Sequence, residues 1–249
     1  MIKNNQQLNE TKLQKALDGH YDFDVKRVIE EGWALTKTSK GAILQGVAIV
    51  LIIFLCVTLV AHNYATNKGL NIESPDIQLA MNIALLILVA PFAAALLMMG
   101  INTSVGKHNT GKNVFEFVSR TLILTATSVI TAAIVQIGLI LFILPCLYLV
   151  IATGFAIPLV LEKGYYPTRA VMMSIRIVNH QWLKFVQLYL FFFLIMFTVI
   201  FTFGLSLIWI APFYYNVKGI LYRDIVVLHS EDTAEVIEAD SDSDGSFHA

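Results

Sequence analysis

The sequence predicts an all-α polytopic integral membrane protein with six transmembrane helices in three pairs. Composition is the first reason, because 57% of the 249 residues are hydrophobic and 14% are charged, whereas soluble domains contain about 25% charged residues. The second reason is that long uncharged apolar runs recur along the chain. The third is that basic residues gather in alternate connections between these runs, which is typical of multi-pass proteins.

The N-terminal part of the chain is polar and precedes the apolar runs. Residues 1–22 contain few apolar side chains, and we expect them to be flexible. Residues 23–41 have the periodicity of an amphipathic helix, because Val28 and Trp33 fall on one helical face and Glu30 falls on another. We therefore predict an interfacial amphipathic helix over residues 23–41, with Trp33 at the level of the lipid headgroups.

The apolar runs predict the transmembrane segments. A bilayer core of about 30 Å requires about 20 apolar residues in a helix. Six segments within a membrane domain of residues 42–228 come close to this length: 43–61, 77–99, 121–143, 146–162, 183–203 and 206–224. The third segment and the fourth segment up to Leu161 belong to one uncharged run, Thr121–Leu161, which we expect to turn at the sequence LPCLY around Pro145.

The distribution of Lys and Arg predicts the orientation in the membrane. If both termini are cytoplasmic, Lys68 is the only one of the 17 Lys and Arg residues that faces outward. Short cytoplasmic loops carry an excess of basic residues, so this arrangement is favoured. We predict a multi-pass protein of the bacterial inner (plasma) membrane with both termini in the cytoplasm.

A proline occurs in the second helix of each predicted pair. These three helix-break candidates are Pro91, Pro158 and Pro212. A proline within a helix leaves the carbonyl four residues earlier without its usual donor. Two of the segments, Leu88–Gly100 and Trp209–Gly219, share the sequence Ala-Pro-Phe and end in glycine. The pattern indicates one structural unit used three times, but chance similarity between apolar helices explains it equally well.

Residues that could carry chemistry are scarce. The core of no predicted span contains an ionisable residue, and the most deeply embedded polar candidates are Asn82 and Gln136. A substrate path lined by these residues is one interpretation, but bonding between helices is the commoner role of such side chains. The chain has no catalytic motif and no metal-ligand spacing of His or Cys. We therefore expect no enzymatic activity, no cofactor, no bound metal and no nucleic-acid partner.

Side chains near the ends of the predicted spans could interact with lipid. The lipid-interface candidates are Trp33, Arg169, Arg176 and Trp182. Recognition of anionic lipid headgroups is one interpretation, and simple anchoring of the helices is the interpretation that we favour. Residues 229–249 are rich in Asp, Glu and Ser and contain no Lys or Arg, which predicts a disordered acidic tail.

One region resembles a known family. Gln136–Trp182 contains a Gly-bearing apolar helix, a proline turn, a second apolar helix with a proline, a Gly loop and a Ser-Arg amphipathic helix. These features are Gly138, Pro145, Pro158, Gly164, and Ser174 with Arg176. The region resembles the YciC-like bacterial inner-membrane proteins and the related membrane domains of glycerophosphodiester phosphodiesterases. Cys146 departs from the glycine that is common in the family turn. The resemblance implies a polytopic inner-membrane protein, and it supplies no catalytic residues.

The sequence thus predicts a non-enzymatic role in envelope maintenance, through binding of a partner or interaction with lipid. The alternative is a translocator of lipid or of a small apolar solute, in which the proline-containing helices surround a cavity. The expected partners are the lipid bilayer, possible anionic headgroups, and a membrane protein or a second copy of the chain. A polar cavity that reaches Asn82 and Gln136 would favour the translocator.

Overall fold

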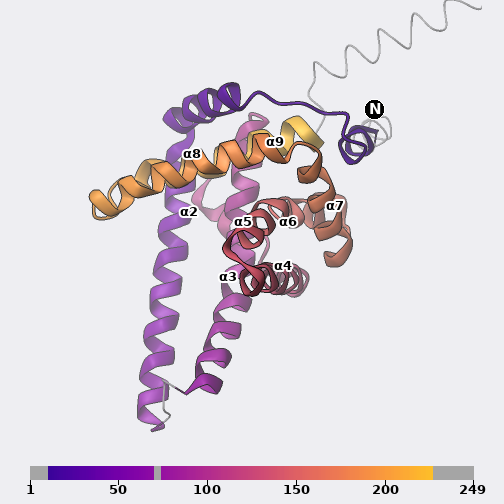
Figure 1. Ribbon diagram of the computed structural model, residues 1–249. Coiled ribbons are helices and arrows are strands. Elements are labelled where there is room, and N and C mark those ends of the chain that lie inside the picture. Colours follow the sequence, from indigo (N-terminus) through magenta and orange to yellow (C-terminus); the bar gives the residue numbers. More distant parts are fainter. Residues whose placement is uncertain (1–10, 70–73, 227–249) are drawn as a thin grey trace, which may run out of the picture.

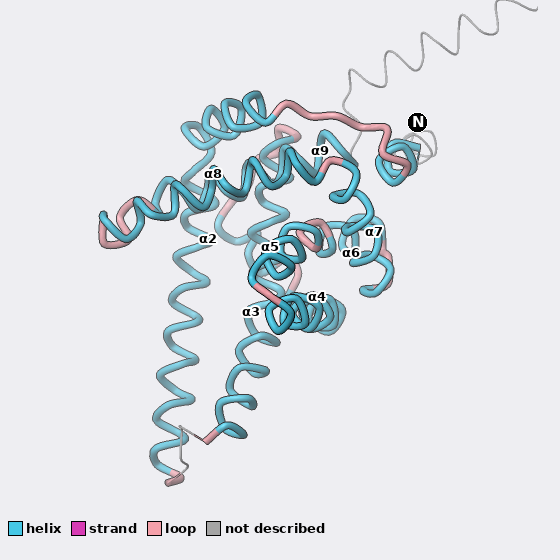
Figure 2. The backbone as a smooth tube through the Cα atoms, viewed as in Figure 1, coloured by secondary structure: helices cyan, strands magenta, loops and turns pink. Residues whose placement is uncertain are grey.

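The computed structural model describes residues 11–69 and 74–226, and the acidic tail predicted for residues 229–249 lies outside them. Within the described residues, the secondary structure is helical and contains no strand (Figure 2). The α-helices are α2 (Val25–Asn67), α3 (Pro75–Ser104), α4 (Thr121–Leu141), α5 (Ile143–Ala152), α6 (Ala156–Lys163), α7 (Pro167–His180), α8 (Trp182–Phe201) and α9 (Leu207–Val226). Two 3₁₀ helices, η1 (Gly111–Phe115) and η2 (Val118–Arg120), precede α4. The predicted all-α class is confirmed.

Several helical segments are long and apolar enough to cross a membrane. Among the described residues there are five: Val25–Asn67, Pro75–Ser104, Gly111–Leu141, Ile143–Lys163 and Trp182–Phe201. Helix α9 is not one of them, because Lys218, Arg223 and Asp224 lie within its 20 residues. The structure is therefore that of a helical protein with multi-pass character.

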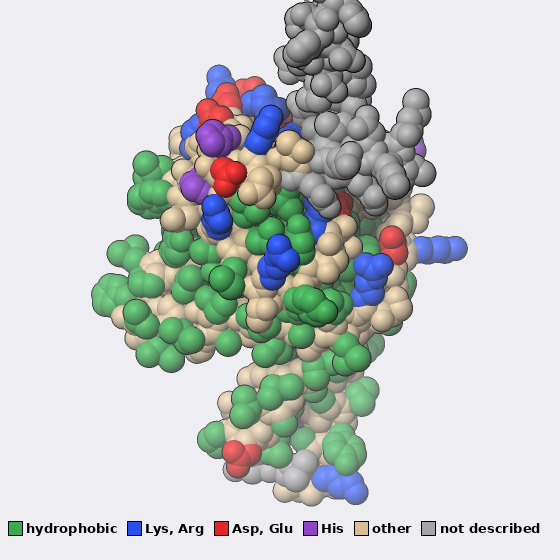
Figure 3. Space-filling model, turned by 90° about the vertical axis from the view of Figure 1, so that its right-hand side faces the viewer, with side chains coloured by type: hydrophobic (Ala, Val, Ile, Leu, Met, Phe, Trp, Pro, Cys, Tyr) green, Lys and Arg blue, Asp and Glu red, His purple; other side chains and the backbone are tan. Residues whose placement is uncertain are grey.

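The long helices are arranged as hairpins that meet at one end. In Figure 1, α2 and α3 run downward as a pair, α8 and α9 extend to the left, and α4 and α5 are seen nearly end-on. The helix pairs thus point in different directions from a shared region. We call this region the hub, and it contains the crossing of α3 and α9 at Gly100 and Gly219. On the face shown in Figure 3, charged side chains gather mainly in the upper part, hydrophobic side chains predominate in the lower part, and charged side chains recur at the lower tip. The apolar ends of the hairpins lie away from the hub.

The predicted interfacial helix and the first predicted span form one continuous helix, α2. The first part of α2 lies across the top of the molecule, and the remainder turns downward (Figure 1). The hydroxyls of Thr36, Thr38 and Ser39 donate hydrogen bonds to backbone carbonyls three or four residues earlier, at 2.7, 3.0 and 2.6 Å. Such bonds compete with the helical hydrogen bonds and bend helices, which is a physical reason for the change of direction.

The two Ala-Pro-Phe segments pack against each other. A Cβ atom at Gly100 would lie 2.1 Å from the carbonyl oxygen of Tyr215, and one at Gly219 would lie 2.2 Å from the carbonyl oxygen of Gly100. Only glycine permits the backbones of α3 and α9 to approach this closely. The shared Gly at the ends of these segments therefore marks a helix crossing.

The turn between α4 and α5 differs from the sequence expectation. The chain turns at Phe142, which has an extended backbone, and Pro145 lies within the first turn of α5. Proline is tolerated there because the first backbone N–H groups of a helix have no intrahelical partner. A Cβ atom at Gly138 would lie 2.7 Å from Leu149 Cδ1, so glycine allows the two helices to pack closely after the turn.

The described part of the N-terminal segment, residues 11–22, differs from the flexible segment that the sequence predicts. Residues 11–17 are helical, and Leu13, Ala16 and Leu17 are buried. The backbone carbonyl of Leu17 accepts a hydrogen bond of 2.8 Å from Arg176 Nε on α7. Apolar spacing over only one or two turns provides too little signal for the sequence to indicate this packing.

Candidate functional site

Trp33 on α2 packs against α9. Its ring centroid lies 5.8 Å from that of Trp209 and 5.7 Å from that of Phe213. Trp33 as a residue is 42% exposed, so it contacts protein while part of it remains accessible. Lys40 lies 3.4 Å from the ring centroid of Trp209, which adds a cation–π contact between the same helices. Trp33 therefore joins α2 to α9 in addition to any contact with lipid.

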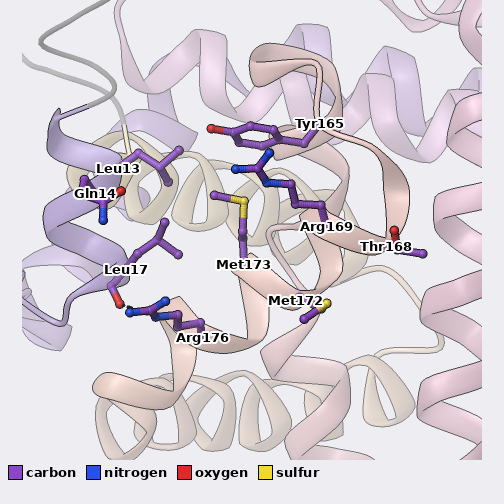
Figure 4. Close-up of a pocket in the computed structure, with 9 residues that line it drawn as sticks. All are labelled: Leu13, Gln14, Leu17, Tyr165, Thr168, Arg169, Met172, Met173 and Arg176. Atoms are coloured by element: carbon purple, nitrogen blue, oxygen red, sulfur yellow. Dashed lines mark hydrogen bonds between the residues drawn. The ribbon is translucent and has the colours of Figure 1, made fainter.

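Arg169 and Arg176 lie in one pocket between the N-terminal segment and α7 (Figure 4). The pocket has a volume of about 810 Å³. Its lining residues are Leu13, Gln14, Leu17, Tyr165, Thr168, Arg169, Met172, Met173 and Arg176. The guanidinium of Arg169 lies 4.9 Å from the ring centroid of Tyr165, whereas Arg176 also lies 3.4 Å from Asp18 Oδ1. Arg176 thus holds the N-terminal segment, and Arg169 contributes positive charge to the pocket.

Tyr21 and Asp22 attach the N-terminal segment to α7 and α8. The Tyr21 hydroxyl donates a 2.5 Å hydrogen bond to the carbonyl of Ile177, and Lys184 donates to Asp22. The hydrogen bond from Lys184 lowers the pKa of Asp22 below its ordinary value. Burial, together with the nearby charge of Asp22, raises the pKa of Tyr21, so its hydroxyl stays protonated as a donor.

The three helix-break candidates occupy different environments. Pro91 lies within α3 and Pro212 lies within α9, and both helices continue past the proline. Pro158 lies in α6, just after the break between α5 and α6 at residues 153–155. Because Pro158 has no N–H, it cannot donate to the carbonyl of Gly154. The fourth predicted span is therefore interrupted in the structure.

Ser174 on α7 satisfies backbone groups at this interruption. Its hydroxyl donates a 2.6 Å hydrogen bond to the carbonyl of Ala152 and accepts a 3.0 Å bond from the amide of Phe155. Ser174 is fully buried. A buried backbone group without a partner is costly, so this hydroxyl stabilises the broken helix.

An apolar groove runs between α5, α8 and α9. It has a volume of about 890 Å³. The lining residues are Leu144, Leu147, Tyr148, Val150, Ile151, Trp182, Val186, Tyr189, Leu190, Phe192, Phe193, Met196, Leu207, Ile210, Ala211, Tyr214 and Tyr215. Several of them, such as Leu144 at 71% and Phe193 at 58%, are exposed. The groove is thus open along its length, and its walls are suited to a hydrocarbon chain.

The end of the groove nearest the hub has a different character. The last residue of α5 that lines the groove is Ile151, and the last residue of α9 that lines it is Tyr215. Lys218 lies one helical turn beyond Tyr215, where its ammonium interacts with the hydroxyls of Tyr189 and Tyr214. Among the described residues, no carboxylate forms an ion pair with Lys218. The groove therefore has apolar walls and a positive charge with phenolic hydroxyls at its inner end.

The broken helix contributes to this inner end. A Cβ atom at Gly154 would lie 3.4 Å from Lys218 Nζ and 3.4 Å from the Tyr189 hydroxyl. Gly154 therefore lies directly beside both polar groups. Lys218 was not among the site residues predicted from the sequence, because the basic residues from this position onward were grouped at a cytoplasmic end. The available signal was its position three and four residues after Tyr215 and Tyr214, on the same helical face.

Asn82 and Gln136 are exposed, and neither lines the groove or the pocket beneath the N-terminal segment. The predicted polar candidates are therefore not brought together in one cavity. In residues 11–69 and 74–226, no group of three or more His, Cys, Asp or Glu side chains could hold a metal ion. Two further polar clusters among the described residues involve Lys218 and, at the hub, Arg223.

Arg223 forms a buried charge network that joins α2, α3 and α9. Its guanidinium donates to both carboxylate oxygens of Glu31, at 2.6 and 3.1 Å, and to the carbonyl of Ser104 at 2.9 Å. Asp224 accepts a 2.8 Å bond from Arg223 and pairs with Arg27, which also lies 3.4 Å from Glu31. Two positive and two negative groups thus balance around the buried guanidinium of Arg223, whereas Arg27 is 51% exposed. The network connects α2, α3 and α9.

Comparisons with known proteins add no relative. No family model matches the chain, and no curated protein or solved structure matches it. The fold and the groove define the chain as an all-helical protein with several apolar helices suited to a membrane.

Proposed function

We propose that this chain is a non-enzymatic lipid-binding protein of a bacterial inner membrane, with a role in envelope maintenance. The observation that carries the proposal is the open apolar groove between α5, α8 and α9, which has a volume of about 890 Å³. Its walls consist of aliphatic and aromatic side chains, and ligand sites of about 300–1,000 Å³ are commonly lined in this way. An acyl chain of a bilayer lipid has the chemistry that such a groove accepts. The resemblance of Gln136–Trp182 to YciC-like proteins is consistent with this location.

We place the protein in the membrane with six spans and both termini in the cytoplasm. Helix α9 has 20 residues, like its hairpin partner α8, and a helix of that length extends about 30 Å. Lys218, Arg223 and Asp224 lie toward its hub end, where charges can remain near the cytoplasmic interface. This topology requires the three helix pairs, which point in different directions in Figure 1, to lie parallel in the bilayer, with the hairpin ends at Lys68, Phe142 and Ser206 facing outward.

The topology predicts a pattern of labelling by a membrane-impermeant thiol reagent. With Cys56 and Cys146 replaced by serine, single variants Lys68→Cys and Ser206→Cys are expected to react in intact cells from which the outer membrane has been removed. Lys107→Cys in the loop after α3 is expected to react only after permeabilisation. Labelling of Lys68→Cys without Ser206→Cys would show that the α8–α9 hairpin does not cross, and would contradict the six-span arrangement.

Native mass spectrometry of the gently extracted protein tests lipid binding. We expect one lipid to be retained per chain. Ala211→Phe places a ring in the groove, because Ala211 lines it, and about a tenfold lower retention is expected, which corresponds to about 1.4 kcal/mol. Ala48→Phe on α2 is the matched control, because Ala48 is exposed and does not line the groove. Equal retention by the two variants would contradict the proposal, and a protein partner without lipid would favour partner binding.

Lipid translocation is a second candidate function, and the interruption of the fourth span favours it. Residues 153–155 lie at the inner end of the groove, and broken helices line the substrate sites of many transporters. A movement of labelled lipid between the leaflets of reconstituted vesicles would support translocation. Retention of lipid without such movement would leave binding as the function.

A further inference from the structure

We infer that the groove selects an anionic phospholipid of the cytoplasmic leaflet, whose headgroup is held by Lys218, Tyr189 and Tyr214. The inference rests on the proposed function, because it assigns a headgroup to the acyl chain in the groove. The geometry points to it because the apolar walls end where the ammonium of Lys218 begins. A phospholipid has the same order of chemistry, with a hydrocarbon chain followed by a charged phosphate.

Charge is the first argument for an anionic headgroup. Lys218 is partly buried on a helix whose neighbouring side chains are apolar or aromatic. A charge that is removed from water requires a compensating partner. The groups around Lys218 are the phenols of Tyr189, Tyr214 and Tyr215, with its ammonium 5.3 Å from the ring centroid of Tyr214, and no carboxylate among the described residues pairs with it. A phosphate would supply the missing negative charge.

Hydrogen bonding is the second argument. A phosphate has several acceptor oxygens, and Lys218 offers an ammonium with up to three donors. The hydroxyls of Tyr189 and Tyr214 can donate as well, and Lys218 Nζ and the Tyr189 hydroxyl lie close together, because each is 3.4 Å from the position that a Cβ atom of Gly154 would take. A choline or ethanolamine headgroup adds a positive charge next to Lys218, whereas a glycerol headgroup does not.

Position in the membrane is the third argument. Lys218 lies at the hub end of the groove, and the proposed orientation places the hub on the cytoplasmic side. The lining residues that are remote from the hub, such as Leu144 and Leu207, lie near the hairpin ends. When the α8–α9 pair lies along the membrane normal, as the proposed six-span topology requires, a lipid bound this way has its phosphate at the cytoplasmic interface and its chain directed toward the bilayer centre.

Quenching of Trp182 fluorescence by brominated lipid tests the inference. Trp182 lines the groove, and it becomes the sole tryptophan in the variant Trp33→Phe/Trp209→Phe. This protein is placed in nanodiscs of phosphatidylcholine that contain a minor fraction of either phosphatidylglycerol or phosphatidylcholine brominated in one acyl chain. We expect brominated phosphatidylglycerol to quench more than its mole fraction predicts, and more than brominated phosphatidylcholine.

Lys218→Met is expected to reduce this preference by about fivefold, the ratio that corresponds to one basic residue at a membrane surface. Lys26→Met is the matched control, because Lys26 is exposed on α2 and remote in sequence from the groove lining. An unchanged preference in Lys218→Met would overturn the assignment of the headgroup site. A brominated fatty acid can be used as the probe in place of brominated phosphatidylglycerol. Its enrichment beside Trp182 would overturn the phospholipid assignment.

The same experiment separates this inference from the proposed function. If both brominated lipids are enriched equally and Ala211→Phe removes the enrichment of both, the groove binds acyl chains without selecting a headgroup. That result overturns the inference and leaves the proposed function standing. If Ala211→Phe changes neither, the groove is not the site, and both are overturned.

Discussion

Replacement of Gly219 with alanine is expected to destabilise the protein by about 3 kcal/mol, the upper end of the usual cost of overpacking. A Cβ atom there would lie 2.2 Å from the carbonyl oxygen of Gly100 and 2.7 Å from the amide nitrogen of Ile101. These atoms belong to the backbone of α3, so no side-chain rotation can make room. Relief requires α3 and α9 to separate, which also weakens the packing of their neighbours. Gly100→Ala is expected to have a similar effect, because its Cβ would lie 2.1 Å from the carbonyl of Tyr215.

The free energy of unfolding in detergent micelles provides the measurement for the glycine variants. Gly41→Ala is the matched control, because Gly41 also lies within a helix and no atom lies within 4 Å of a Cβ at that position. Alanine favours a helix over glycine by about 0.8–1 kcal/mol, so the control is expected to be neutral or slightly stabilising. If Gly219→Ala were as stable as Gly41→Ala, the close crossing of α3 and α9 would be wrong.

Replacement of Arg223 with methionine is expected to cost about 3–5 kcal/mol, which is typical when one partner of a buried ion pair is removed. The Arg223 side chain is 8% exposed and donates to Glu31, Asp224 and the carbonyl of Ser104. Its loss leaves two carboxylates with Arg27 as the remaining positive partner of the network. The uncompensated charge and the unpaired carbonyl together account for the large effect.

A double-mutant cycle distinguishes this network from a general loss of packing. Glu31→Met/Arg223→Met is expected to cost less than the sum of the two single substitutions, because each single variant leaves a charge without its partner. Arg223→Lys is expected to recover part of the stability, since lysine keeps the charge but cannot form the two parallel bonds to Glu31. Lys26→Met breaks an exposed pair with Glu30, of 82% and 68% side-chain exposure, and serves as the control. Additive effects would contradict the network.

The helices can be predicted from the sequence because the requirement for backbone hydrogen bonding acts within each contiguous segment. A membrane leaves a backbone no water to bond with, so apolar runs of sufficient length become helices. The predicted spans 77–99 and 183–203 accordingly fall on α3 and α8. The shared Ala-Pro-Phe segments were also visible in the sequence, but their contact through Gly100 and Gly219 was not. Apolar periodicity does not specify which two helices approach each other.

The candidate site was far less accessible to sequence reasoning. Gln136 was expected to lie deep in a span as a candidate for a substrate path, and it lines neither the groove nor the pocket beneath the N-terminal segment. Lys218 was grouped with the basic residues of the cytoplasmic side, and it lies close to Tyr189. The charged residues in α9 favour the interpretation that this part of the helix lies at the edge of a membrane span. Whether such a charged side chain contacts water, a carboxylate or a groove depends on residues remote in the chain, such as Gly154.

The sequence by itself determined the class of this protein: an all-helical chain with apolar segments of membrane-spanning length, because hydropathy and helix length are properties of contiguous residues. The tertiary structure alone decided where those helices cross, how residues 11–22 pack on α7 and which polar groups become buried together. The pairing of Arg223 with Glu31 and the position of Lys218 at the end of an apolar groove are of this kind. Each depends on contacts between distant segments, which no local pattern of residues encodes.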